Sequence, residues 1–452
     1  MKEMLTKIPS PFSDLLISVF NKYQYLIRHS GIYKATKKIR KKYDYLNLED
    51  LKNIQQKRLK DFIEYSKKNS DYYANTLKNL RIETVADLKD APFLEKEDIV
   101  NRLEEILTIS PQRGIESYTG GTTGASLKVI YKNEDMQERF AYLDYFRELY
   151  GYKLGKKTAW FSGKSLLSKR DISRKKFYKD DIINKIRFFS TFNIIESNAY
   201  AYYEALNRYE PEFLVGFPSS VLRICKFCEM HNLKFKKTAK YFFPAAEKIT
   251  DEHREVIYRV MGCEIKDQYA SSEGAPFMFE CSNGKMHIDI TSGVFEVLDE
   301  NGNDIDEGEL VVTSFSTRGT PLIRYKVGDK VSISNEKECE CGSNFPICKE
   351  IDGRKDDFLI SKTNGEINLG NISNATKGVD GIINFQLTQN TLDKINVKVA
   401  ATNNFTNAQQ TKFLDALKQR FGDDMHLNLT VVEEIPLEKS GKFRIIKNHI
   451  KQ

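Results

Sequence analysis

The chain has 452 residues, of which 40% are apolar and 12% aromatic, so it is long enough for two or three domains with substantial cores. Its net charge of +7 is modest for this length, which gives weak support for anionic ligands such as nucleotides and little for a nucleic-acid partner. Seven cysteines without a secretory leader predict a protein of the reducing cytoplasm rather than a disulfide framework.

The first fifty residues hold an apolar stretch and a basic run. FSDLLISVF contains Asp14, is short and is not followed by a cleavage site, so we do not expect a signal peptide. No window approaches the roughly 18 apolar residues of a membrane span. The lysines and arginine between Lys34 and Lys42 are compatible with peripheral contact to a membrane or with phosphates, but such runs are usually solvated helix faces, and we interpret this one as surface.

A helical lead-in is predicted by the apolar spacing of three and four residues from about Leu46 to Leu107. After a glycine-rich loop we expect a short strand, LKVIY, and an aromatic-rich helix from Met136 to Tyr150. Strands and helices then alternate, which predicts an α/β layout. The segments are KTAWFSG, FLVGFPSS with VLRICKFCEMH, AKYFFPAAE with TDEHREVIYRVMG, and EIKDQYASSE.

Short extended runs and an Asn-Gly turn predict mainly β structure from Met286 to Ile333. A smaller α+β unit follows, with strands INFQLT, KINVKVAA and LNLTVVEEI and a helix from Asn407 to Phe421. We therefore expect a large N-terminal domain over residues 1–355, its helical lead-in covering about 1–110, and a small C-terminal domain over 356–452.

The loop SYTGGTTGASLK is unusually rich in glycine and threonine. Glycines let backbone N–H groups approach an anion and threonines add hydroxyl donors, so phosphate is the expected guest. The loop lacks the G-x-x-x-x-G-K-[ST] spacing, which argues against a P-loop NTPase. Alone, such a cluster is more often an ordinary turn.

Five short motifs give this loop a context. They are TGGTTG (119–124), YASSE (269–273), IRYKVGD (323–329), GRKDD (353–357) and SGKFR (440–444). Their order resembles that in adenylate-forming enzymes, the acyl-CoA synthetase superfamily, over about Leu46 to the C-terminus. GFPSS (216–220) and TPLIRYKVGD (320–329) look like the phenylacetate-CoA ligase branch, with its CapK-like relatives associated with capsular polysaccharide biosynthesis.

The resemblance implies a large adenylation domain, a small mobile C-terminal domain and an ATP site. Glu273 would help to hold Mg²⁺, a hard cation that prefers carboxylate and phosphate oxygens, and Asp329 would accept hydrogen bonds from the ribose hydroxyls. The phosphate-binding residues would be Thr119, Gly120, Gly121, Thr122, Thr123 and Gly124. The other nucleotide-binding residues would be Ala245, Ala246, Glu247, Tyr269, Ser272 and Arg354. Ala270 replaces the family's usual glycine, which leaves the shape of the acyl pocket open.

Two residues near the C-terminal domain would serve the reaction cycle. By resemblance, Lys442 is the catalytic lysine that stabilises charge near the α-phosphate, together with Glu273. Asp356 corresponds to the hinge about which the small domain rotates. Read without the other motifs, Lys442 would be a surface lysine in a lysine-rich tail.

A metal site is predicted from Cys281, His287, Cys339 and Cys341. Three cysteines and a histidine suit a closed tetrahedral zinc site that staples loops rather than catalyses, and relatives of phenylacetate-CoA ligase have similar patterns. Reduced structural cysteines are the alternative. Cys225 and Cys228, three apart on an expected helix, are interpreted as core.

The resemblance implies an ATP-dependent ligase that joins a carboxylic acid to a thiol such as coenzyme A. The segment INLGNISNATKG departs from the glycine- and proline-rich version typical of CoA ligases, so an amine acceptor, for instance in polysaccharide biosynthesis, is the alternative. A nucleotide-binding scaffold that has lost its chemistry is a third interpretation. Glu273, Asp329 and Lys442 argue against that scaffold because all three are retained.

Overall fold

The computed structural model of the chain describes residues 8, 10–118, 127–163, 166–336, 338–352, 358–436 and 444–450. Helices dominate the first hundred residues, and α4 begins where the Asn47 side chain accepts a hydrogen bond from the Asp50 N–H at 2.8 Å. The elements are α2 (Phe12–Arg28), α3 (Tyr33–Tyr43), α4 (Leu48–Asn69), α5 (Asp71–Thr76), η1 (Ala86–Asp90), α6 (Lys96–Ile106) and η2 (Pro111–Arg113). None of the helices among the described residues is long and apolar enough to cross a bilayer.

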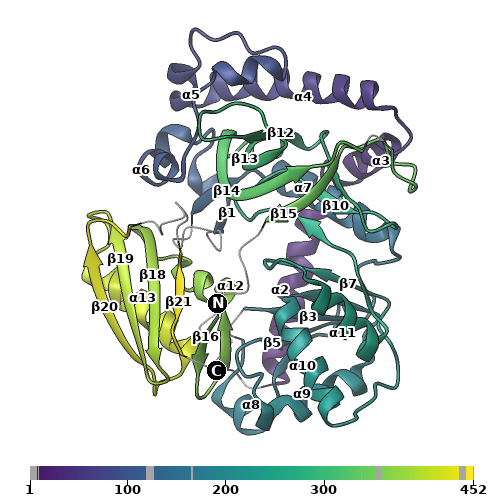
Figure 1. Cartoon of the computed structure of the whole chain (residues 1–452), viewed down its shortest axis with the longest axis vertical. Helices are drawn as coiled ribbons and strands as arrows, with labels where there is room; N and C mark the ends of the chain where they lie inside the picture. Colours follow the sequence, from purple (N-terminus) through teal and green to yellow (C-terminus); the bar gives the residue numbers. More distant parts are fainter. Residues whose placement is uncertain are drawn as a thin grey trace.

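A six-stranded sheet in the order β4-β5-β3-β6-β7-β8 forms the middle of the chain, with its strands parallel except for β4. Helices follow the strands, as the alternating pattern predicted, and surround the sheet (Figure 1). The strands are β3 (Thr158–Ser162), β4 (Tyr178–Asp181), β5 (Ile186–Ser190), β6 (Phe213–Gly216), β7 (Tyr241–Pro244) and β8 (Glu264–Ile265). The helices are α8 (Lys169–Ser173), α9 (Glu196–Tyr209), α10 (Pro218–Met230) and α11 (Asp251–Met261).

A seven-stranded antiparallel sheet, ordered β12-β13-β14-β15-β11-β10-β9, packs against α4, α5 and α6 in a separate core. The strands are β9 (Gln268–Tyr269), β10 (Met278–Glu280), β11 (Met286–Ile288), β12 (Gly293–Leu298), β13 (Glu307–Ser314), β14 (Leu322–Ile333) and β15 (Ile347–Asp352). A hairpin of β1 (Ile115–Tyr118) and β2 (Lys128–Tyr131) leads into helix α7 (Asn133–Leu149). Aromatic side chains of α7 pack with those of β6, β7 and β10, so this helix joins the two large sheets.

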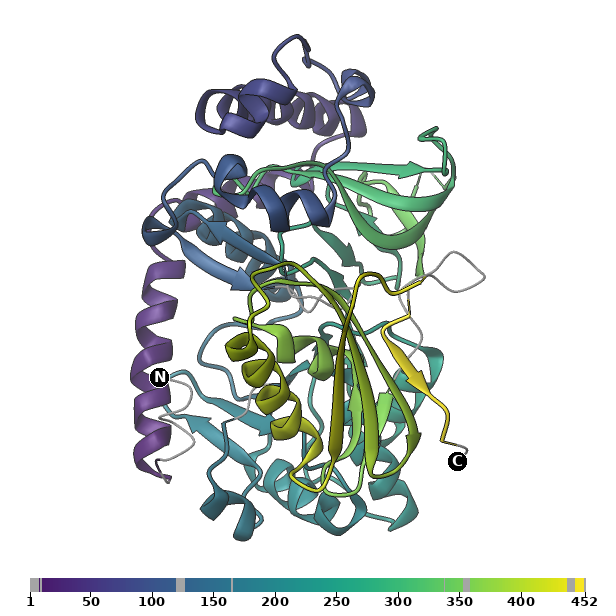
Figure 2. The same cartoon turned by 90° about the vertical axis from the view of Figure 1, so that its left-hand side faces the viewer.

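The C-terminal part forms its own hydrophobic core between Leu359 and Ile446. Its main sheet has the order β20-β19-β18-β21, with helix α13 packed on it (Figures 1 and 2). The elements are β16 (Phe358–Ser361), β17 (Gly365–Asn368), α12 (Leu369–Ser373), η3 (Asn374–Thr376), β18 (Ile382–Thr391), β19 (Lys394–Ala401), α13 (Asn407–Phe421), β20 (His426–Val432) and β21 (Ile446–Asn448). The expected fold class, an α/β protein with a smaller α+β part, is confirmed; the boundary near Asp356 lies outside the described residues and stays a prediction.

Candidate functional site

The loop after β9 carries Glu273 and is held from inside the molecule by Arg139 of α7. The Arg139 guanidinium is buried and donates to the carbonyl oxygens of Gly274 at 2.9 Å and of Ser271 and Ala275, both at 3.2 Å. A planar guanidinium with five N–H donors is well suited to collecting several carbonyls at once. Arg139 therefore fixes the backbone on both sides of Glu273.

The β1–β2 hairpin holds the same loop from a second direction. Ser117 Oγ and the Tyr131 hydroxyl both donate to the carbonyl oxygen of Ser272, at 3.1 and 2.9 Å. Ser117 and Tyr131 belong to the two strands that flank the predicted phosphate loop, and the last pair of the hairpin register is Tyr118 with Lys128. The predicted phosphate residues 119–124 lie outside the described residues, but the strands on either side reach the Glu273 loop.

Gly274 shows why the loop needs a residue without a Cβ. Its φ is +115°, and a Cβ there would lie 2.3 Å from Thr317 Cγ2 and 2.8 Å from the Tyr131 hydroxyl. Residues with a side chain rarely adopt such a φ, and Thr317 and Tyr131 leave no room for a Cβ atom. The Glu273 side chain, which directly precedes this turn, is buried.

Glu273 lies in an environment that disfavours its charge. Burial raises the pKa of its carboxyl group above the ordinary value, and the nearby Asp329 carboxylate raises it further, while Ser271 and Lys96 act in the opposite direction. The two carboxylates repel each other electrostatically, and a divalent cation would relieve this repulsion. The buried Glu273 carboxylate thus suits the Mg²⁺ ligand that the resemblance predicts.

The side chains of Asp329 in β14 and Tyr269 in β9 are joined by a hydrogen bond, although the two strands are not neighbours in the seven-stranded sheet. The Tyr269 hydroxyl donates to Asp329 Oδ2 at 2.8 Å. Desolvation of the hydroxyl and the adjacent carboxylate raise the pKa of Tyr269 well above its ordinary value, so the phenol stays protonated and remains a donor. The structure therefore brings together Tyr269, Ser272, Glu273 and Asp329, four of the predicted site residues.

The predicted adenine segment follows β7. Ala246 has a left-handed φ of 66°, and the Ala245 N–H donates to the Gly216 carbonyl at 2.9 Å, so the segment turns sharply at the end of the parallel sheet. The Gln268 side chain, next to Tyr269, donates to the Pro244 carbonyl at 3.0 Å and so joins this turn to β9. The turn and the Glu273 loop consequently adjoin the same short strand.

Glu247 accepts hydrogen bonds from residues that the sequence did not predict as its partners. Its carboxylate accepts from the Ser219 N–H at 2.9 Å and from Ser219 Oγ at 2.8 Å, at the N-terminus of α10, where negative charge is favourable. It also accepts a hydrogen bond from the Asn368 side chain of the C-terminal part. Glu247 thus connects the predicted adenine segment to the small α+β unit.

Three further predicted residues, Arg354, Asp356 and Lys442, lie outside the described residues. The chain just after Lys442 is well anchored, because the Leu387 N–H donates to the Ile445 carbonyl and the Gln386 side chain donates to the Arg444 carbonyl, both at 2.7 Å. The terminal motif therefore ends at the edge of the four-stranded sheet, beside β18.

The predicted metal ligands form one compact cluster. The ligand atoms of Cys281, His287, Cys339 and Cys341 all lie within 4.8 Å of one another. Cys281 Sγ and Cys339 Sγ are 3.8 Å apart, far beyond the roughly 2.05 Å of a disulfide, and Cys341 Sγ is 3.4 Å from His287 Nε2. Cys348, also near in sequence, is outside this cluster.

The ring of His287 is oriented for a ligand role. Its Nδ1 lies 2.8 Å from the Phe345 carbonyl, which fixes the proton on Nδ1 and leaves the Nε2 lone pair directed toward Cys341. Burial lowers the pKa of His287, which favours the neutral imidazole that binds metals. Cysteine and neutral histidine are the ligands that zinc prefers.

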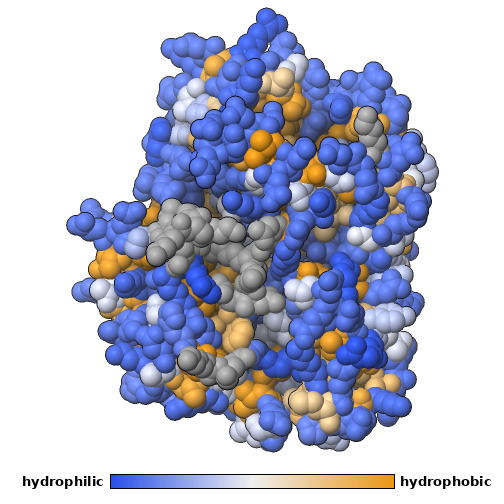
Figure 3. All heavy atoms as spheres, in the orientation of Figure 1, coloured by the Kyte–Doolittle hydropathy of each residue, from blue (hydrophilic) through white to orange (hydrophobic). Residues whose placement is uncertain are grey.

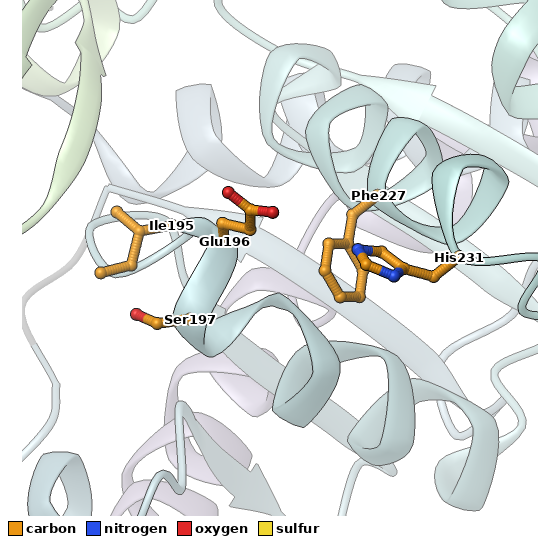
Figure 4. A pocket seen from close by; sticks show the side chains of 5 residues that line it. All are labelled: Ile195, Glu196, Ser197, Phe227 and His231. Atoms are coloured by element: carbon orange, nitrogen blue, oxygen red, sulfur yellow. The ribbon is translucent and has the colours of Figure 1, made fainter.

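A separate surface hollow of about 550 Å³ lies between the start of α9 and the end of α10 (Figure 4). Its lining is Ile195, Glu196, Ser197, Phe227 and His231, with the rings of Phe227 and His231 4.4 Å apart between centroids. Of the predicted nucleotide and metal residues that the structure describes, none lines this hollow.

Comparison with known proteins decides the family. Residues 359–449 match the model of the CapK C-terminal domain. The chain is 33% identical to protein CapK of Staphylococcus aureus over 452 residues, which cover 98% of each chain. The chain belongs to the CapK family.

Two further similarities connect this CapK-family chain to adenylate-forming enzymes. It is 28% identical to phenylacetate-coenzyme A ligase of Pseudomonas putida over 172 residues, 35% of this chain and 37% of that enzyme. Its fold matches that of 2-hydroxyisobutyryl-CoA ligase in the postadenylation state, with a TM-score of 0.57 and 14% identity over 90% of this chain and 91% of the other. The CapK-like branch inferred from the motifs is therefore confirmed, and the fold is the one found in an adenylate-forming CoA ligase.

Sequence reasoning missed Arg139 and Tyr131, which hold the Glu273 loop in this CapK-family chain. Both precede the loop by more than 130 residues and belong to no recognisable motif. The only signal was a charged residue among the aromatic side chains of the expected helix, and this pattern is equally typical of an amphipathic surface.

We propose that the Cys/His cluster of this CapK-family chain holds one structural zinc ion. Elemental analysis of purified protein should give about one zinc per chain. Cys339→Ser should lower the zinc content and the melting temperature, because it removes one of four ligands. Cys348→Ser is the matched control, since this buried cysteine lies in β15 outside the cluster, and it should keep its zinc. Wild-type protein that is stable and free of metal would contradict the proposal.

Proposed function

We propose that the chain activates a carboxylic acid with ATP to form an acyl adenylate and then passes the acyl group to a thiol such as coenzyme A. The observation that carries the proposal is the convergence of three predicted motifs. Hydrogen bonds from Ser117 and Tyr131 join the β1–β2 hairpin to the Glu273 loop. The Asp329 carboxylate accepts from Tyr269 and repels the Glu273 carboxylate electrostatically. Membership of the CapK family and the partial likeness to phenylacetate-coenzyme A ligase support it.

The chemistry requires charge to be held at each stage. A carboxylate is a poor electrophile, and its adenylate becomes reactive as pyrophosphate leaves. We propose that Glu273 holds Mg²⁺, which would neutralise phosphate charge, while the loop 119–124 would bind the β- and γ-phosphates. Arg139 and Tyr131 would keep Glu273 in place without touching the substrate.

The nucleoside would lie between β9, β14 and the turn after β7. The Asp329 carboxylate accepts a hydrogen bond from Tyr269. An ionised carboxylate can accept from two hydroxyl groups at once, and this is the role that we propose for Asp329 toward the ribose. Ala245, Ala246 and Glu247 would approach adenine from the other side. Arg354 would reach the ribose or phosphate region, and Lys442 would stabilise the charge that develops at the α-phosphate.

A polar junction between the small unit and the parallel sheet suits a domain that changes position about Asp356. The side chains in contact include Asn364 with Asn193 at 3.1 Å and Asn371 with Thr191 at 3.2 Å, and Arg223 forms an ion pair with Glu366. Interfaces of this kind exchange protein contacts for water at small cost, unlike apolar cores. Rotation would withdraw Lys442 after adenylation and admit the acceptor.

An amine acceptor is the second candidate. The segment INLGNISNATKG, which replaces the glycine- and proline-rich sequence of CoA ligases, forms the end of β17, α12 and η3, and its asparagines face the parallel sheet. The departure of this segment from the sequence of CoA ligases is the ground for an acceptor other than coenzyme A, such as an amino group in surface polysaccharide biosynthesis.

The first half-reaction can be tested by exchange of labelled pyrophosphate into ATP, with Mg²⁺ and a panel of carboxylic acids. At least one acid should support exchange, and Lys442→Ala should slow it by about 10²-fold or more because a charge-stabilising contact is lost. Lys418→Ala, on α13, is the matched control and should retain the wild-type rate. No exchange with any acid, despite ATP binding, would favour a scaffold without chemistry.

The acceptor can be identified in single-turnover experiments on adenylate preformed in the protein. Coenzyme A should consume the bound adenylate at least about tenfold faster than simple amines or amino sugars, because the thiol is the proposed acceptor. Water alone provides the background rate. Faster consumption by an amine, with amide as the product, would replace the thiol reading by the amide-ligase alternative.

A further inference from the structure

Helix α2 is inverted relative to an ordinary surface helix, because polar residues occupy its buried face. Ser13, Asp14 and Ser18 are buried, with Ile17 among them. Most surface helices bury their apolar stripe and expose their polar one. The apolar face of α2 therefore points away from the protein.

Polar contacts fix this orientation. Lys179 of β4, which is fully buried, donates to the Ser13 hydroxyl at 2.7 Å and forms an ion pair with Asp171 at 2.8 Å. Asp14 pairs with Lys176 at 3.1 Å, and the Ser18 hydroxyl accepts from the Ile182 N–H at 2.8 Å. Rolling the helix to bury its apolar face would leave these buried groups without partners, which is costly.

The outward face of α2 is a continuous apolar stripe with a spacing of three and four residues. Each of its seven members exposes 40% or more of its surface: Phe12 68%, Leu15 56%, Leu16 43%, Val19 56%, Phe20 40%, Tyr23 60% and Leu26 59%. Figure 2 shows α2 along an outer edge of the molecule, with none of the described helices and strands on its outer side. By contrast, the face drawn in Figure 3 is mainly hydrophilic, with apolar residues dispersed over it.

Two more exposed apolar residues lie in a turn that contacts α2. Ile182 and Ile183, in the turn between β4 and β5, are 64% and 46% exposed, and the Ile182 N–H is bonded to α2 through Ser18. An exposed apolar helix face of this kind marks an interaction site.

The charge of α2 and α3 indicates what covers the stripe. Residues 12–43 contain eight lysines and arginines against the single acid Asp14, a surplus of seven that equals the net charge of the whole chain, +7. Lys22, Lys34, Lys38, Lys41 and Lys42 are exposed. The molecule thus concentrates its positive charge next to its exposed apolar helix.

We propose that α2, with the lysines of α3, binds the surface of an anionic membrane, with α2 lying in the plane of the interface. An amphipathic helix with Phe and Leu on one side and nearby lysines matches the lipid interface, where acyl chains lie beneath negative headgroups. At 17 residues α2 is about 25 Å long, enough to lie along the surface but not to span it with its polar face.

Self-association through the same surface is less favourable. Two copies facing each other through α2 would bring two basic clusters toward one another, and like charges at an interface oppose binding. The membrane site extends beyond the ligase proposal and does not depend on it, because α2 contributes none of the residues proposed to bind nucleotide.

Co-sedimentation of the full chain with lipid vesicles tests the site. Vesicles containing about 30% phosphatidylglycerol in phosphatidylcholine should bind the protein at about 50 mM salt, more weakly at about 500 mM salt, and more tightly than pure phosphatidylcholine does. Leu15→Gln, Val19→Gln and Leu26→Gln, combined, should reduce binding to the anionic vesicles by at least about tenfold. Since these side chains are exposed, the variant should keep the wild-type melting temperature.

A matched control removes equally exposed apolar residues elsewhere. Met230→Gln with Tyr258→Gln, on α10 and α11, should leave vesicle binding unchanged. Lys34→Gln, Lys38→Gln and Lys41→Gln, combined, should weaken binding and reduce its salt dependence. The proposal is overturned if the wild type does not bind anionic vesicles, or if the α2 variant binds as well as the wild type. It is also overturned if light scattering shows a dimer that the α2 variant dissociates while vesicles remain unbound.

Discussion

The arrangement of the candidate site depends on the Arg139 guanidinium. From the middle of α7 it collects the carbonyl oxygens before and after Glu273. Because α7 also packs its aromatic residues against β6, β7 and β10, the position of the loop is tied to both large sheets. Because this buried cation is satisfied by carbonyl oxygens, it does not pair with the Glu273 carboxylate, which we propose to hold Mg²⁺.

Helix α7 also carries buried acidic residues that form ion pairs with arginines. Glu138 pairs with Arg58, and it also accepts from Arg318 at 3.0 Å; Arg318 in turn reaches Asp135 at 3.2 Å. Such a network specifies one arrangement of the helix, since removing any member leaves a charge buried without its partner. The proposed zinc cluster would stabilise the seven-stranded sheet. It joins the turn after β10 and strand β11 to the loop between β14, the strand of Asp329, and β15.

Short motifs and periodicity predicted those features that residues close together in the sequence determine. The helix from Asn407 to Phe421 is α13 as expected, and the Cys/His spacing anticipated a real cluster. Long-range contacts had no such signal: nothing in the sequence near Arg139 refers to Ser271, and Glu247 gave no sign of its bond to Asn368. The pattern of α2 showed which residues share a face but not which face is buried, because Lys176 and Lys179, more than 150 residues away, decide that.

The most direct test of this account measures the binding of Mn²⁺, used in place of Mg²⁺, to the protein with a non-hydrolysable ATP analogue, from about pH 4.5, the ordinary range for a glutamate, to about pH 8. Burial raises the pKa of Glu273, so its proton must be lost at a higher pH than for an exposed glutamate before it can bind a cation. We expect Mn²⁺ affinity to rise with pH across this range in the wild type, and the Glu273→Gln variant to bind weakly with little dependence on pH. Equal affinity in the two proteins, or a wild-type affinity that does not change with pH, would contradict the assignment of Glu273 to the metal.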